Sequence, residues 1–200
     1  MSGNLFLDWA VIAISFFNAI LLLWLGFTVL LNSDRRSPGL WAAGAGLLLG
    51  AAFFISHTAI IGRGVITLGL ASAIFWWTIA MVPAIILPFA WYVITLWYSG
   101  FWNDPLSNLR RRQRPWLLLT SGGLALGLLS LAAGVVLLAM PSPNLDNLRL
   151  FIRWSVAGIP LLAVGYSLYV ILCIGLSLDA LRRPGPPRRV MGDLARRRAH

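Results

Sequence analysis

The sequence predicts an all-α bundle of five membrane-spanning helices, and its composition, its apolar runs and the placement of its arginines all point to this class. Of its 200 residues, 59% are hydrophobic and 11% are charged, whereas a soluble domain has about 45–50% apolar and about 25% charged residues. A soluble fold of this size could not hide so much apolar surface, so lipid must cover the remainder. The chain has 16 basic residues, all of them arginines, and most fall into three clusters beside apolar runs. Positive residues stay preferentially on the cytoplasmic side, so these clusters orient every span.

The first two spans are continuous apolar runs joined by a short polar loop. The first covers about 5–31 and the second about 40–61. The loop contains Arg35 and Arg36 and then Pro38, which ends a helix because it lacks a backbone donor. Each run exceeds the ~20 residues needed to cross ~30 Å of hydrocarbon.

The long apolar segment 65–101 decides the number of spans. As one straight helix it would be ~55 Å long, too long for a single crossing. As two crossings it would leave only about 18 residues for each, and it has no polar turn between them. One crossing keeps the arginine clusters on the same side, whereas two would split them. We therefore expect one long third span, about 73–101, kinked at Pro83 and Pro88.

The last two spans follow the second arginine cluster. The fourth covers about 116–140 and the fifth about 154–178, with Pro160 as a third candidate kink. Residues 1–181 would then form the transmembrane domain and 182–200 a basic, proline-rich tail. The amino terminus would lie outside and the carboxyl terminus in the cytoplasm, in a bacterial inner membrane.

The clustered arginines are expected to contact anionic lipid head groups at the cytoplasmic face. The residues assigned to these contacts are Arg35, Arg36, Arg110, Arg111, Arg112, Arg114, Arg182, Arg183, Arg188 and Arg189. In this orientation only Arg63, Arg149 and Arg153 face outward. Spanning helices explain the basic residues, so nucleic acid is not expected as a partner.

Few residues suggest catalysis. The six acids are expected at span ends or in loops, and no carboxylate lies deep in an apolar run, which disfavours a proton-coupled transporter. Metal and haem sites need several clustered ligands, and one histidine within a span does not supply them. No phosphate-binding glycine loop or nucleophile elbow is present. We therefore expect no enzyme activity, no catalytic residue, no metal and no cofactor.

Two small groups of residues are candidates for ligand binding. His57 lies near the outer end of the second span, and with Asp8 and Arg63 it could form a small polar site. The alternative is a histidine anchored by hydrogen bonds near the interface. Trp91 and Tyr92 follow the second kink of the third span and could line a cavity for an apolar ligand. The alternative is a role in helix packing and in the interfacial aromatic belt.

Pairs of glycines indicate close helix contacts. Gly46 and Gly50, and likewise Gly123 and Gly127, are spaced to share one helix face. They favour packing within the chain over formation of a homodimer, which remains the alternative.

The stretch 88–102 (PFAWYVITLWYSGFW), followed by an arginine-rich loop, resembles the multi-span amino-terminal region of some bacterial sensor histidine kinases. The resemblance implies membrane helices that detect an external or membrane signal and pass it to cytoplasmic kinase domains. No phosphoacceptor or ATP-binding motif is present, so the chain itself is not expected to be a kinase. Its last residues read like the basic introduction to another span, and a longer protein and a short chain with a basic tail both remain open.

Three hypotheses follow. The first is a membrane sensor or signalling domain in which the kinked third helix relays the signal. The second is a structural subunit of a larger respiratory or photosynthetic membrane complex, which would explain the lack of catalytic residues. The third, which the residues favour least, is a small transporter or a lipid-modifying enzyme.

Overall fold

The computed structural model describes residues 5–32, 38–63, 70–139, 155–156 and 159–185, and within them it is built from long helices. These helices are α1 (Leu5–Asn32), α2 (Pro38–Arg63), α3 (Leu70–Tyr98), α4 (Asn108–Ala139) and α6 (Leu161–Arg182). Two-residue strands, β1 (Ser155–Val156) and β2 (Ile159–Pro160), pair antiparallel just before α6. All five helices are long and apolar enough to cross a membrane, as the sequence predicted.

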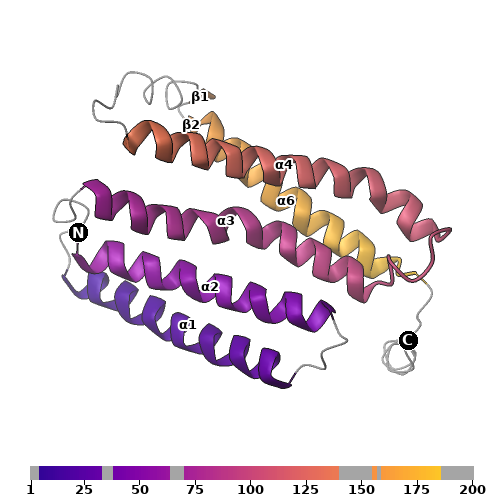
Figure 1. Cartoon of the computed structure of the whole chain (residues 1–200), viewed down its shortest axis with the longest axis horizontal. Helices are drawn as coiled ribbons and strands as arrows, with labels where there is room; N and C mark the ends of the chain where they lie inside the picture. The colour runs from indigo at the N-terminus through magenta and orange to yellow at the C-terminus, as the bar shows by residue number, and fades with distance from the viewer. Residues whose placement is uncertain (1–4, 33–37, 64–69, 140–154, 157–158, 186–200) are drawn as a thin grey trace.

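The helices lie side by side in the order α1, α2, α3, with α4 and α6 together on the far side of α3 (Figure 1). The central helix is therefore α3, which packs against α2 on one side and against α4 and α6 on the other. Successive helices run in opposite directions (Figure 1). One helix, α3, that is long and apolar enough to cross a membrane occupies the described part of the segment 65–101, as the prediction of one span requires.

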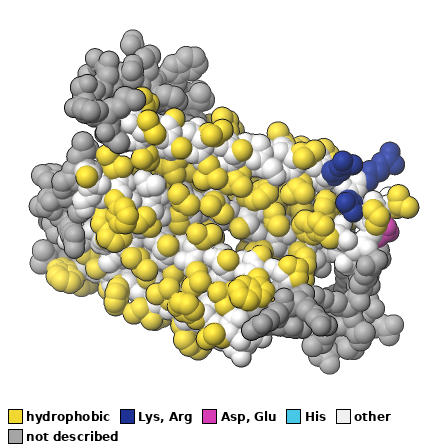
Figure 2. Space-filling model, viewed as in Figure 1, with side chains coloured by type: hydrophobic (Ala, Val, Ile, Leu, Met, Phe, Trp, Pro, Cys, Tyr) yellow, Lys and Arg dark blue, Asp and Glu magenta, His cyan; other side chains and the backbone are white. Residues whose placement is uncertain are grey.

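One end of the bundle carries the described arginines of α4 and α6, and we call it the arginine end. The ends of α1, α3 and α6 and the starts of α2 and α4 meet there (Figure 1). The space-filling view shows the arginines gathered at this end, while apolar side chains cover the length of the visible face (Figure 2). Arg35, Arg36, Arg149, Arg153, Arg188 and Arg189 lie outside the described residues.

Glycines allow α1, α2 and α3 to pack closely. A Cβ atom on Gly44 would lie 2.6 Å from the side chain of Leu30 and 3.4 Å from the carbonyl oxygen of Gly26. A Cβ on Gly39 would lie 2.1 Å from the ring of Trp97. A Cβ on Gly46, by contrast, would meet nothing within 4 Å, so Gly46 is not part of the tight contact.

The third helix ends at Tyr98, three residues before the predicted boundary at 101. Gly100 has a positive φ of 85°, which is strained for residues with a Cβ. The amide of Phe101 donates to the carbonyl of Leu96 (3.0 Å), and that of Gly100 donates to the carbonyl of Trp97 (3.2 Å). This bond pattern is a Schellman motif, with its usual apolar contact between Phe101 and Leu96, both of which are buried in one cluster. The motif turns the chain toward α4.

The fourth helix begins at Asn108, eight residues before the predicted start at 116. Ser107 caps it, because its Oγ accepts a bond from the amide of Arg110 (3.3 Å). Pro115 lies inside the helix, near its start. The second arginine cluster is therefore helical, which gives each arginine a fixed direction.

The fifth spanning helix begins at Leu161, seven residues later than predicted, and Pro160 does not kink it. Pro160 lies in β2, directly before the first helical residue. Proline is well suited to this position, because the amide that it lacks would have no partner within the helix. The predicted inclusion of Pro160 in the span was wrong.

Candidate functional site

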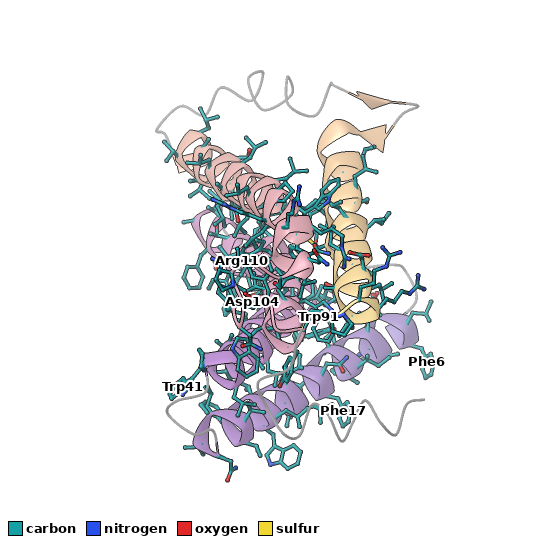
Figure 3. All side chains as sticks on the ribbon, turned by 90° about the vertical axis from the view of Figure 1, so that its right-hand side faces the viewer. Phe6, Phe17, Trp41, Trp91, Asp104 and Arg110 are labelled. Atoms are coloured by element: carbon teal, nitrogen blue, oxygen red, sulfur yellow. The ribbon has the colours of Figure 1, made fainter. Side chains whose placement is uncertain are left out.

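The buried core of the described bundle lies toward the arginine end of α3, α4 and α6. Its members are Tyr92, Leu96, Phe101, Leu109, Cys173, Leu176 and Ala180, with Leu117, Tyr169 and Leu172 packed against them. Large side chains on α1 and α2, such as Phe6, Phe17 and Trp41, instead point outward (Figure 3). This outward apolar surface is what a lipid environment covers.

A chain of polar contacts runs through this core, and we call it the Asp179 network. The hydroxyl of Tyr92 donates to Oε1 of Gln113 (2.8 Å), and Nε2 of Gln113 donates to Oδ2 of Asp179 (2.6 Å). Nε of Arg112 lies 2.9 Å from the same carboxylate oxygen and forms an ion pair with it. The network therefore joins α3 through Tyr92, α4 through Gln113 and Arg112, and α6 through Asp179.

The position of Gln113 explains why the network holds together. Its side chain is fully buried, and both its amide oxygen and its amide nitrogen have partners. A buried amide without partners would be unfavourable, so the network stabilises the arrangement of the three helices in which both partners are present. Asp179 is partly exposed and carries the charge that Arg112 neutralises. The arrangement positions helices and presents no open nucleophile.

A second set of contacts lies where Pro88 interrupts the hydrogen bonding of α3. Pro88 has no amide hydrogen, so the carbonyl of Ala84, four residues earlier, lacks its helical donor. The hydroxyl of Tyr166 on α6 donates to that carbonyl at 2.9 Å. One turn along α6, Tyr169 donates to the carbonyl of Ile85 at 3.4 Å. The proline interruption in α3 is thus tied to α6.

Glycines of α4 complete the packing around this interruption. A Cβ on Gly127 would lie 3.0 Å from the side chain of Ile85, and one on Gly123 would lie 3.3 Å from Tyr169. This glycine pair packs within the chain, which is the arrangement that the sequence favoured. The middle of α3 is consequently held between α4 and α6.

The chain that follows α6 also contacts α3. The amide of Gly185 donates to the carbonyl of Ser99 (2.8 Å), one of the carbonyls left open at the end of α3. Gly185 is buried there, close to Leu109 of α4. The C-terminal end of α3 is therefore bonded to the segment that follows α6.

The structure separates Trp91 from Tyr92, so the expectation that they line one cavity was wrong. Successive residues of a helix point about 100° apart. Tyr92 is fully buried in the Asp179 network, whereas Trp91 is 62% exposed on the surface of the bundle. Two hollows of the described surface lie along α4.

The structure pairs His57 with Ser15 across α1 and α2. Ser15 Oγ lies 3.0 Å from Nδ1 of His57, whose ring stacks on Phe53 with centroids 6.0 Å apart. This contact fits the anchored histidine that the sequence left as the alternative. Asp8 is half-buried on α1. Arg63 is the last residue of α2, and its side chain lies outside the described part.

Sequence reasoning missed the residues that matter most in these contacts. Gln113 sits within a run of arginines and carries no spacing signal that separates it from them. Tyr166 could have been found, because a proline inside a span leaves a carbonyl open and a hydroxyl on a neighbouring helix can satisfy it. Arg112 was grouped with the lipid contacts, but it turns inward to Asp179.

Comparison with protein-family models, with curated proteins and with solved structures finds no match to this chain.

Proposed function

We propose that this chain is a sensor or signalling domain of a bacterial inner membrane, in which α3 relays a signal along the bundle. The observation that carries the proposal is the double attachment of α3. Its proline interruption is bonded to α6 through Tyr166, and its C-terminal end is bonded to Gly185. A change in the bend of α3 would therefore alter the position of its C-terminal end and of Gly185 at the arginine end.

The proposed orientation places the arginine end in the cytoplasm and the amino terminus outside. It rests on the positive-inside rule and on the gathering of the described arginines of α4 and α6 at one end. In this proposal the chain acts without catalytic chemistry of its own. It passes on a conformational change, and anionic head groups at the cytoplasmic face hold its arginines.

A sensor needs an element with two arrangements, and a structural subunit needs only one. The test is a distance measurement between spin labels at Tyr98→Cys on α3 and Leu181→Cys on α6, in a Cys173→Ala background and in lipid bilayers. Both labelled side chains are exposed at the arginine end. The relay predicts two distance populations, and replacing Pro83 and Pro88 together with alanine should change their ratio.

A control pair on Phe27→Cys and Trp41→Cys joins α1 to α2, outside the proposed relay, through two exposed positions. We expect a single population there, unaffected by the proline replacements. One narrow population at the α3–α6 pair, unchanged by Pro83→Ala with Pro88→Ala, would contradict the relay.

The second candidate is a structural subunit of a larger membrane complex. The outward face of α1 favours it, because Trp9, Phe17 and Trp24 are each more than half exposed along one long helix. Aromatic side chains of this kind are common at protein interfaces. Stable co-purification with redox subunits would favour this candidate over the sensor.

A further inference from the structure

The surface of α4 carries two adjoining hollows of different chemistry. The first, which we call the basic groove, has a volume of about 590 Å³ and is lined by residues that include Leu106, Arg110, Arg111, Arg114 and Leu118. The second, the apolar groove, has a volume of about 560 Å³ and lies between α4 and α6. Leu118 lines both, so the two hollows adjoin at this residue.

The basic groove is suited to a phosphate group. Three arginines line it, and no acidic residue does. The guanidinium of Arg110 is placed over the ring of Phe101, 5.8 Å from its centroid, while Arg111 and Arg114 are exposed. Arginine forms paired hydrogen bonds with the oxygens of phosphate and carboxylate groups, which suits an oxyanion such as a phosphate ester better than a halide. Arg112 takes no part, because it pairs with Asp179.

The apolar groove is suited to a hydrocarbon chain. Exposed leucines line it, among them Leu119 and Leu126 of α4 and Leu168 of α6. Gly122 lies between them, and a Cβ there would meet nothing within 4 Å, so the space beside this glycine is open.

The two grooves together match the length of a lipid in one leaflet. From Arg114 to Leu126 the helix rises ~18 Å. Half of a ~30 Å hydrocarbon core is ~15 Å, which is the depth that an acyl chain spans. The positive charge lies at the start of α4, where a head group would be, and the leucines follow it toward the middle of the helix.

We propose that one anionic phospholipid binds along α4, with its phosphate held by Arg110, Arg111 and Arg114 and one acyl chain in the apolar groove. This site is independent of the sensor proposal, because it requires no movement of α3. It also differs from general attraction of arginines to a charged membrane, since it selects three arginines and one groove.

The test uses the full chain in dodecyl maltoside micelles and counts bound lipids by native mass spectrometry. The probes are dioleoylphosphatidylglycerol and dioleoylphosphatidylcholine, which share their acyl chains and differ in net charge. We expect one phosphatidylglycerol per chain, bound at least about tenfold more tightly than phosphatidylcholine, from ~1 kcal/mol for each arginine near the phosphate. Equal binding of the two lipids to the unmodified chain would overturn the proposal without relying on any variant.

Two pairs of matched variants distinguish binding at this site from a general effect of positive charge or of surface hydrophobicity. The double variant Arg111→Gln with Arg114→Gln should weaken phosphatidylglycerol binding about 30-fold. The control is Arg182→Gln with Arg183→Gln, which removes two exposed arginines at the same end of the bundle. This control should change phosphatidylglycerol binding less than about twofold. Gly122→Leu should fill the apolar groove and weaken binding of both lipids, whereas Gly175→Leu, at an exposed α6 glycine outside the groove, should not.

Equal losses in the two arginine pairs would overturn the assignment of the phosphate to the basic groove. Unchanged binding in Gly122→Leu would overturn the assignment of the acyl chain. Glycerol phosphate, which has the anionic group without the chains, should not displace the lipid at millimolar concentration. Displacement by glycerol phosphate would show a phosphate site alone and would overturn the lipid proposal.

Discussion

The hydroxyl of Tyr166 on α6 donates a hydrogen bond, 2.9 Å long, to the carbonyl of Ala84 on α3. In a regular helix the amide of residue 88 would donate to that carbonyl, but Pro88 has no amide hydrogen. In hydrocarbon no water is present to replace the missing donor, so a side chain from a neighbouring helix supplies it. The interruption of hydrogen bonding in α3 thus provides the acceptor for a specific contact with α6.

This pairing predicts a coupling between Tyr166 and Pro88. Tyr166→Phe should lower the free energy of unfolding by about 0.5–1.5 kcal/mol, because the Ala84 carbonyl loses its donor. In a Pro88→Ala background the restored amide can bond to that carbonyl, so the same substitution should have a smaller effect. The measurement is a double-mutant cycle from unfolding in mixed detergent micelles. Additive effects of the two substitutions on the free energy of unfolding would show that the Tyr166 hydroxyl does not compensate for the amide that Pro88 lacks.

The Asp179 network predicts that neighbouring arginines differ in their effect on stability. Arg112→Gln should destabilise the bundle by up to about 1 kcal/mol, since its ion pair with Asp179 is partly exposed. Arg111→Gln, one residue earlier and exposed, should leave stability unchanged and act only on lipid binding. Thermal unfolding of the two variants, measured side by side, tests the difference. Equal losses would argue against a structural role for Arg112.

Gln113 should be the most sensitive position in the network. Gln113→Ala removes the partner of Tyr92 and one partner of Asp179 together, and we expect a loss of about 1–3 kcal/mol from the unsatisfied groups. Tyr92→Phe removes only one hydrogen bond and should therefore have the smaller effect. Unfolding curves for both variants give the comparison, and a larger loss in Tyr92→Phe would contradict the order.

The contact of Gly39 with Trp97 predicts a steric effect between α2 and α3. Gly39→Ala should destabilise the bundle, because the new methyl group would overlap the indole ring. Gly46→Ala on the same helix has open space and serves as the control. Trp97→Leu should relieve much of the loss in Gly39→Ala. Thermal unfolding of the three variants tests this steric effect. Equal losses of stability in Gly39→Ala and Gly46→Ala would exclude the clash with Trp97.

The orientation is testable with single cysteines in a Cys173→Ala background. Leu106→Cys, 91% exposed at the arginine end, should resist a membrane-impermeant maleimide in intact bacterial cells. Gly62→Cys, exposed at the opposite end, should be labelled. A reversed labelling pattern would place the arginine end outside.

The sequence predicted the five long apolar helices of the described residues, because bilayer thickness limits the length of an apolar run and arginines cluster beside such runs. It predicted boundaries less well where local hydrogen bonds set them, as at Gly100 and Ser107. Both residues are ordinary termination and capping signals, but the continuous apolar and basic runs around them dominated the interpretation.

The contacts of the candidate site were less predictable, for a physical reason. Gln113 is buried because α3 and α6 supply its two partners, and neither partner is near it in sequence. Residues such as Gly26 and Gly44 likewise become close only when two helices approach. Long-range pairing of this kind leaves no regular spacing in a single sequence.

The order of helices in the bundle also bears on how the protein is made. Because α1, α2 and α3 lie next to one another in the order of the chain, each has its neighbour in place soon after leaving the ribosome. When α4 and α6 are synthesised, they meet a face of α3 that already exists. Tyr166 follows α4 in the chain, so it can bond to the Ala84 carbonyl of α3 only after α3 and α4 have been synthesised.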